Sequence, residues 1–359
     1  MTTSPSNPST SQDSPSIFRW LDSVASVKDD QQSVTAQVDR DPPTSLSDLA
    51  DRLAALHVQA DRWSSPDLLA QLRANPSRPI DTVLCNILDE NSEAPLEAHV
   101  AAEFAPDLVG GLESLAKVSG ASRVLAALGH DCPPEQARKI RDAFVGTRIV
   151  PIVLRSDYPQ PNPILLIHQI TRRHVRWGQP PTDEGIILLD AAAAVVVGQA
   201  INLAKPMTSV PLAIHDYTHR ATHYAIAPLG MRWGELLDAF EISTDVAELR
   251  AGSPLRQIRL GIDDVITGGE LMLSASWPEP RVVPDPCIRC SWCVEGCPVR
   301  IRPEALLDAA QQEDLYTAGR LGLDACIECG ICSYVCPSHL PLLKGIRVLR
   351  KSQTGSRKR

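Results

Sequence analysis

The sequence predicts an α/β protein that ends in a compact, cysteine-rich region, and three observations carry this prediction. Between residues 80 and 204, short apolar runs alternate with helical segments, which is typical of a parallel sheet covered by helices. Residues 205–277 contain several short strand-like runs and one helix, which indicates a small α+β domain. Eight of the ten cysteines then lie between Cys287 and Cys336, which indicates a metal-binding region.

Residues 1–44 are predicted to form a polar, disordered segment. Its beginning, residues 1–16, is rich in Ser, Thr, Pro and Asn and shows no hydrophobic periodicity, and one short helix is expected at residues 17–27. The segment lacks the basic start and apolar run of a secretory signal. We also expect no transmembrane segment, because no apolar stretch reaches the length of about 18 residues that spanning requires.

An α/β domain is expected over residues 45–204. Ser45 or Ser47 can cap its first helix, in which leucines recur at helical spacing. The remaining pattern predicts helices at 66–74, 95–118, 134–144 and 191–203, and strands at 81–85, 123–128, 149–154 and 185–190.

A second, small α+β domain is expected over residues 205–277. The pattern predicts one helix at 230–240 and strands at 210–214, 222–227, 260–266 and 271–276. His215, His219 and His223 recur at every fourth position, but the sequence around them is typical of strand and turn, so we expect no metal site there. A proline-rich connector leads to the cysteine region.

Two cysteine runs with identical spacing, C-x2-C-x2-C-x3-C-P, begin at Cys287 and at Cys326. This spacing is the ligand pattern of paired [4Fe–4S] clusters, in which the fourth cysteine of each run serves the other cluster. We therefore predict two [4Fe–4S] clusters in a domain over residues 283–347. Cluster one is assigned to Cys287, Cys290, Cys293 and Cys336, and cluster two to Cys326, Cys329, Cys332 and Cys297.

Zinc sites and disulfides are the alternatives for these eight cysteines. Zinc ribbons use C-x2-C pairs separated by a long loop, and disulfide frameworks belong to short secreted chains. Four closely spaced cysteines in each run, in a chain without a recognisable signal, favour iron and sulfur. Of the two upstream cysteines, Cys85 is expected to be a small buried apolar residue, and Cys132 is expected to have no function.

Charge gives three further expectations. The net charge of −8 argues against nucleic acid as a partner. Cluster one has Arg289, Arg300 and Arg302 nearby in sequence, whereas cluster two has Asp324 and Glu328, so we expect cluster one to have the higher potential. Residues 348–359 form a basic tail, expected to be either solvated or docked on an acidic partner or an anionic membrane face.

The second cysteine run carries a family resemblance. Cys326 to Ser338, followed by Leu340-Pro341-Leu342, resembles the end of the C subunit of the Rnf electron-transport complex and of its relatives, the cobalamin reductases of propanediol-utilising microcompartments. Upstream similarity to the same family lies at 171–175, 180–187, 210–214 and 227–237. The resemblance covers residues 45–347 and implies a Rossmann-like flavin domain, a small β-grasp (SLBB-like) domain and an α-helical ferredoxin-like dicluster domain.

The resemblance fails where the family binds FMN. A glycine-rich loop of the form G-x-G-G-A-G-F-P should follow the first helix, but residues 57–66 contain no glycine. A backbone that closely approaches a phosphate needs glycine, so the Rossmann-like domain is predicted to be degenerate and FMN is not expected. The family's next motif is reduced to an acidic stretch, in which Asp89, Glu90 and Glu93 are expected to form a solvated loop.

We therefore expect an electron-transfer subunit of a redox complex, cytoplasmic and peripheral to a membrane only through its partners. Its clusters would relay electrons between a donor protein and an acceptor subunit. Two alternatives stay open: an FMN-containing, NADH-dependent oxidoreductase acting on a quinone or corrinoid, and a partner-binding adaptor with structural clusters. Flavin content separates the first alternative from the relay, and cluster reducibility separates the second.

Overall fold

The computed structural model describes residues 16–21, 43–76, 78–243, 248–269, 271–278 and 282–357. The described helices are α2 (Leu46–Ala55), α3 (Leu68–Arg73), α4 (Leu96–Glu103), α5 (Ala105–Ser119), α6 (Pro134–Phe144), α7 (Pro163–Thr171), α8 (Ala191–Leu203), α9 (Trp233–Ala239), α10 (Trp292–Glu295), α11 (Pro303–Gln311), α12 (Leu315–Arg320), α13 (Ile331–Tyr334) and α14 (Leu342–Arg357), with 3-10 turns η2 (Pro181–Glu184) and η3 (Leu323–Ala325). The described strands are β1 (Arg19–Trp20), β2 (Thr82–Ile87), β3 (Arg123–Gly129), β4 (Ile149–Leu154), β5 (Ile186–Asp190), β6 (Ser209–Asp216), β7 (Ala221–Pro228), β8 (Glu248–Ala251), β9 (Ile258–Arg259) and β10 (Met272–Ser276).

The predicted parallel sheet is confirmed. Its four strands lie in the order β4-β3-β2-β5, and every pair is parallel. Side chains alternate along β2, so that Val83 and Cys85 face one core while Leu84 packs with Leu166 of α7 in a second core. Cys85 is fully buried, as expected from the sequence.

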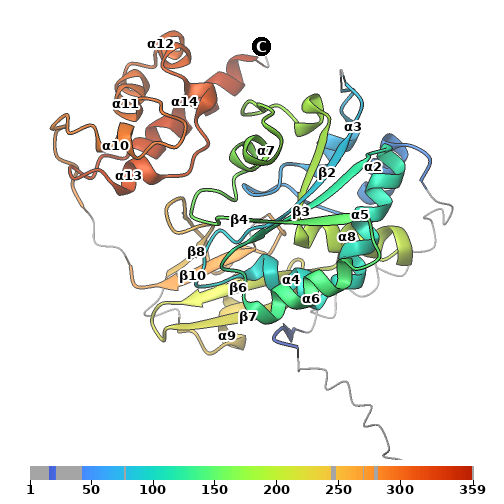
Figure 1. Ribbon diagram of the computed structural model, residues 1–359. Coiled ribbons are helices and arrows are strands. Elements are labelled where there is room, and N and C mark those ends of the chain that lie inside the picture. The colour runs from blue at the N-terminus through green and yellow to red at the C-terminus, as the bar shows by residue number, and fades with distance from the viewer. Residues whose placement is uncertain are drawn as a thin grey trace, which may run out of the picture.

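A second sheet lies on the other side of α4, α5 and α8 (Figure 1). It contains six strands in the order β1-β7-β6-β10-β8-β9, in which β6 and β7 form a hairpin and β10 runs parallel to β6. One hydrophobic core joins the two sheets through the helices between them. The C-terminal region, drawn in orange and red, stands to one side of both sheets.

Three predicted elements are wrong. The helix expected from residue 17 is a strand at Arg19–Trp20 that pairs with β7, because Phe18 is buried against Phe104 and Tyr224; residues 22–27 lie outside the described part. The single helix expected at 95–118 is divided at Phe104, because Pro106 cannot continue the hydrogen-bond ladder of α4.

The strand expected at 260–266 is a turn followed by one bridge. The Asp264 carboxylate accepts a hydrogen bond from the Gly261 amide, and the Asp264 amide donates one to the Gly261 carbonyl. Val265 then forms an isolated bridge with Arg232. No sequence pattern predicted α7 or β8. Among the described residues, no helix is both long enough and apolar enough to cross a membrane.

The second cysteine loop is fastened to the α/β domain by two aromatic side chains. The Trp63 indole donates a hydrogen bond of 2.8 Å to the Ile327 carbonyl, and the Tyr158 hydroxyl donates one to the Cys329 carbonyl. The two rings stack, with centroids 5.6 Å apart and an interplanar angle of 19°. These contacts satisfy backbone carbonyls of the loop and fix its position against residues far away in the sequence.

Gly330 is required by this docking. Its φ is +83°, and a Cβ there would come within 1.9 Å of the Leu255 carbonyl oxygen. Ser291, at the matching position of the first cysteine run, adopts the same left-handed conformation with a φ of +65°. Because a serine is accommodated in one copy, the close approach of Leu255 explains the glycine in the other.

We expect Gly330→Ser to loosen the C-terminal region from the segment between β8 and β9 of the second sheet, at a cost of about 1–3 kcal/mol in unfolding free energy, because the new side chain collides with the Leu255 backbone. The matched control is Ser291→Gly, which changes the equivalent position outside the contact. Urea unfolding and limited proteolysis of the connector at residues 278–286 would measure both. Equal behaviour of the two variants would contradict the role of the Leu255 contact.

Candidate metal centre

The two cysteine runs fold as copies of each other. Each has a one-turn helix after its second cysteine, α10 in the first run and α13 in the second. Both copies also have positive φ at the same three positions, which are Arg289 and Glu328, Ser291 and Gly330, and Arg300 and His339. Left-handed residues within a tight loop turn successive N–H groups toward one side, which forms a concave site for an anionic group.

A first cavity, of about 560 Å³, lies in the C-terminal region. The cysteines that line it are the set predicted for cluster one: Cys287, Cys290, Cys293 and Cys336. Cys287 and Cys290 are exposed, whereas Cys293 is buried with its Sγ 3.7 Å from Oε2 of Glu304. Burial, with this carboxylate, raises the pKa of Cys293 to about 11.

A second, narrower cavity is lined by the set predicted for cluster two: Cys297, Cys326, Cys329 and Cys332. Its free volume is about 20 Å³, because Ile327, Leu343 and Ile346 pack closely around the thiols. The Glu328 amide donates a hydrogen bond of 3.4 Å to the Cys326 Sγ. Burial raises the pKa of Cys329 to about 11 and that of Cys332 to about 12.

These residues fit iron–sulfur clusters in their donor chemistry. Four thiols surround each cavity, and a ligand must displace thiol protons, which burial holds on Cys293, Cys329 and Cys332 by raising their pKa values. The second loop would have to spread to admit a four-iron core. Within the described residues, no three His, Cys, Asp or Glu side chains converge on one ion, as zinc would require. A [4Fe–4S] cluster instead takes one thiolate at each iron.

Two arginines of α14 change the charge around the second set. Arg347 and Arg350 form ion pairs with Glu328 at 3.1 and 3.2 Å, and Arg350 is only 7% exposed. These arginines are therefore not part of a solvated basic end, and α14 continues through most of the predicted tail. The first cavity is lined by Glu304 and Asp308 as well as arginines. Both cysteine sets therefore have arginines and carboxylates nearby, and the higher potential of cluster one stays a prediction.

Residues 57–66, which stand where the family has its glycine-rich loop, are held in place by a buried ion pair. Arg62 donates two hydrogen bonds to Asp190, at 2.5 and 2.6 Å, and a third to the Gly268 carbonyl. Asp190 caps α8, and the Glu97 carboxylate accepts hydrogen bonds from the amides of Ala191 and Ala192. The chain's own carboxylates thus occupy the α8 N-terminus, where a phosphate would otherwise be favoured.

The acidic stretch is only partly solvated, which corrects the expectation for Asp89. This carboxylate accepts a 2.6 Å hydrogen bond from the Glu97 amide, and burial raises its pKa to about 8. Glu93 is half-exposed, accepts a hydrogen bond from Tyr217 and lies 3.6 Å from the His215 ring. The physical reason is that the chain turns back before α4, so that Asp89 accepts this bond from an amide in the first turn of the helix.

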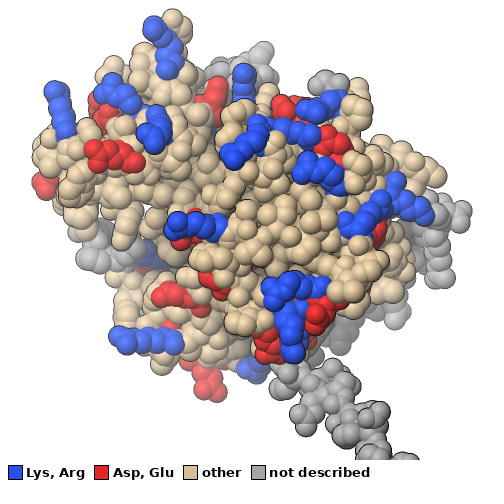
Figure 2. All heavy atoms as spheres, in the orientation of Figure 1, with Lys and Arg blue, Asp and Glu red and all other residues tan. Residues whose placement is uncertain are grey.

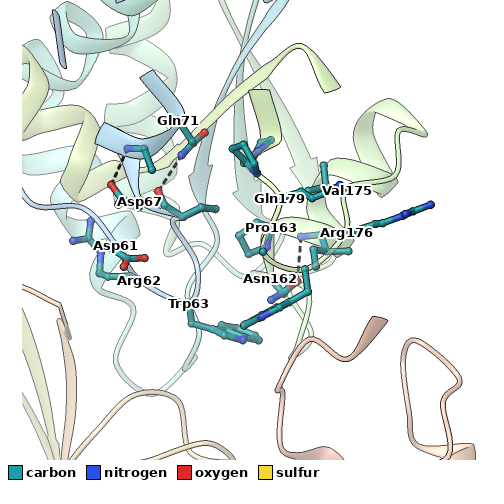
Figure 3. Close-up of a pocket in the computed structure, with 17 residues that line it drawn as sticks. Asp61, Arg62, Trp63, Asp67, Gln71, Asn162, Pro163, Val175, Arg176 and Gln179 are labelled. Carbon is teal, nitrogen blue, oxygen red and sulfur yellow. Dashed lines mark hydrogen bonds between the residues drawn. The ribbon is translucent and has the colours of Figure 1, made fainter. Parts of the chain in front are cut away.

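A cavity of about 370 Å³ opens beside the segment that contains Arg62, with Trp63 between its two walls (Figure 3). Asp61, Asp67 and Gln71 lie on one side, and Val175, Arg176 and Gln179 on the other. Gln71 is fully engaged, since it bonds the Pro66 carbonyl and both backbone groups of Leu188. Burial, together with nearby Asp67, raises the pKa of Asp61. The lining thus holds two carboxylates, Asp61 and Asp67, and two guanidinium groups, Arg62 and Arg176.

The three histidines each have a different partner. His215 lies on β6 and bonds Thr222, His219 lies in the hairpin turn and bonds Asp216, and His223 lies on β7 against Phe240. The face shown in Figure 2 has Lys and Arg interspersed with Asp and Glu. A general nucleic-acid binder gathers its basic residues on one face.

Four residues near the second cavity were missed by sequence reasoning: Trp63, Tyr158, Trp177 and Arg350. Trp63 and Tyr158 lie 264 and 171 positions before the carbonyls that they bond. Two of the four are tryptophans in otherwise polar segments. Such a tryptophan indicates a packing contact, but the sequence does not show which residue it contacts.

Comparison with known proteins agrees with the resemblance seen in the sequence. A family model described as a 4Fe-4S dicluster domain matches residues 286–341. The C subunit of the proton-translocating ferredoxin:NAD(+) oxidoreductase complex of Clostridium ljungdahlii is 22% identical over 251 residues, which are 68% of this chain and 54% of that protein. The C subunit of the ion-translocating oxidoreductase complex of Pasteurella multocida is 29% identical over 253 residues, 68% of this chain and 30% of that protein.

The chain therefore spans about half, or less, of the length of these relatives. Among solved structures, the NAD+-reducing [NiFe]-hydrogenase is similar in its air-oxidized state, with a TM-score of 0.54 and 11% identity over 90% of this chain and 58% of that one. Its H2-reduced state gives a TM-score of 0.55, 12% identity and coverage of 90% and 63%. At such identities the likeness concerns the fold alone. Over two thirds of its length, the chain is similar to the C subunits of ion-translocating oxidoreductase complexes, and its cysteine region matches a 4Fe-4S dicluster domain.

Proposed function

We propose that this chain relays electrons through two [4Fe–4S] clusters as a subunit of a redox complex. Each bound cluster would accept and release one electron at a time. The observation that carries the proposal is the lining of the two cavities. Each contains three cysteines of one run and the fourth cysteine of the other, which is the crossed assignment expected from the spacing.

Crossed ligation would place the two clusters next to each other. Cys293 and Cys336 share one cavity although they belong to different runs, and Cys297 shares the other with Cys326. The short segment from Cys293 to Cys297 would then connect a ligand of cluster one to a ligand of cluster two. An electron entering at the exposed thiols Cys287 and Cys290 would pass inward to the buried set.

The partners of this relay would be a donor protein and an acceptor subunit. The curated relatives are C subunits of ion-translocating oxidoreductase complexes, and this similarity supports a place in such a complex. We propose that the chain reaches a membrane only through these partners.

We further propose that the α/β domain is a degenerate Rossmann-like domain without FMN. Residues 57–66 lack glycine, and the Glu97 carboxylate bonds the two amides at the start of α8. A phosphate placed there would have to displace a carboxylate and approach Asp190. The second sheet, with its β6–β7 hairpin, parallel β10 and helix α9, would be the small β-grasp (SLBB-like) domain.

One observation favours the flavin-containing alternative. The cavity of about 370 Å³ contains Trp63, whose indole bonds the loop of the second cysteine set. A planar cofactor there would lie next to cluster two, and NADH oxidation would then be the leading activity.

We expect the anaerobically purified chain to contain about eight irons and no flavin, because the crossed scheme has two four-iron clusters and the α8 N-terminus is filled. Iron assay, acid-extracted flavin fluorescence and electron paramagnetic resonance after dithionite reduction would measure this on one sample. About one FMN per chain would contradict the degenerate domain. Clusters that dithionite cannot reduce would favour the structural adaptor instead.

Paired substitutions distinguish crossed from uncrossed ligation. In the crossed scheme Cys290→Ser and Cys336→Ser damage the same cluster, so the double variant should keep about four irons. Cys329→Ser with Cys336→Ser should damage both clusters and keep almost none. In uncrossed ligation, all four cysteines of one run would bind the same cluster, and the two double variants would show the reverse order of iron contents. A single anaerobic iron assay of both double variants therefore decides between the schemes.

A further inference from the structure

The internal repeat places different charges at matching positions around the two cavities. The offset between Cys287 and Cys326 also separates the starts of α11 and α14, so Asp308 of the first copy corresponds to Arg347 of the second, and Gln311 corresponds to Arg350. Asp308 and Gln311 line the first cavity. The second copy therefore carries two guanidinium groups where the first carries a carboxylate and an amide.

Arg350 is the more closely held of the two arginines. Its Nη2 donates hydrogen bonds to the carbonyl oxygens of Cys326 and of Leu323, the latter at 3.1 Å. Its Nη1 lies 3.2 Å from the Glu328 carboxylate. The guanidinium is thus fixed against the backbone of a cysteine that lines the second cavity, at 7% exposure.

A side chain of the α/β domain also holds the Arg350 guanidinium in place. The Arg350 guanidinium lies 3.9 Å from the ring centroid of Trp177, a cation–π contact. Trp177 belongs to the segment between α7 and η2 and also lines the cavity of Figure 3. The position of the positive charge therefore depends on contacts from both parts of the molecule.

Burial and positive charge have opposite effects on the reduction potential of a cluster in the second cavity. A reduced cluster carries one more negative charge, which a buried, poorly solvated site disfavours. A fixed positive charge favours the reduced form, and its effect is screened little inside the protein. Arg347 and Arg350 face two carboxylates, Glu328 and Asp324, but Asp324 is exposed, so solvent screens its charge more than that of the buried Arg350.

We propose that Arg350 raises the reduction potential of cluster two and thereby keeps a buried cluster reducible. This inference rests on the proposed function, because it requires a cluster on Cys297, Cys326, Cys329 and Cys332. Arg350 is a positioning and tuning residue and ligates no iron. Trp177 holds its guanidinium in place from the α/β domain.

The test is a potentiometric titration of the full chain with dithionite, followed by electron paramagnetic resonance. Arg350→Gln should move the midpoint of one cluster to a more negative value and leave the other unchanged. Arg350→Lys keeps the charge and should move it less. The repeat supplies the reciprocal variant, Gln311→Arg, which should raise the midpoint of the other cluster, by a smaller amount because residue 311 is exposed.

The cluster that moves is identified in the Cys290→Ser/Cys336→Ser background, where only cluster two should remain. Arg320→Gln, an exposed arginine of α12, is the charge-matched control and should move neither midpoint. An unchanged cluster-two midpoint in Arg350→Gln, at full iron content, would overturn the inference. If Arg350→Gln loses iron, an unchanged midpoint in Gln311→Arg, at full iron content, overturns it. A wild-type chain without two reducible clusters would refute the proposed function itself.

Discussion

The position of the C-terminal region depends on the contact of the second cysteine loop with the α/β domain and with the segment between β8 and β9. Gly330 lets the loop approach the Leu255 carbonyl, and Trp63 and Tyr158 bond two further carbonyls of the loop. The loop's backbone groups are thereby satisfied by distant residues rather than by water. This contact decides which of the two copies in the repeat is buried and which one faces outward.

The two copies have the same backbone and different surroundings. Positive φ angles recur at three matched positions, so the local geometry of each loop is set by its own sequence. Exposure is not matched: Cys287 and Cys290 are exposed, whereas Cys326 and Cys329 are buried. An exposed and a buried set, joined by crossed cysteines, would provide a directional path between the surface and the α/β domain.

The α/β domain keeps the framework of a parallel sheet but fills its anion-binding position from within. Asp190 and Glu97 bond the amides at the start of α8, and Arg62 neutralises Asp190. A helix N-terminus attracts negative charge, and side-chain carboxylates meet that demand as well as a bound phosphate would. The domain then serves as the surface on which the second loop rests.

The sequence by itself determined the parallel sheet, several helices of the α/β domain and the spacing of the eight cysteines, because hydrophobic period, capping residues and ligand spacing are local properties. α6 and β4, for example, begin and end where the pattern predicted. Tertiary structure alone decided that Phe18 enters the core in a strand, that the half-buried Asp89 bonds the Glu97 amide, and that Arg347 and Arg350 lie beside Glu328. Each of these depends on contacts between residues far apart in the chain, where burial and charge pairing leave no periodic signal in the sequence.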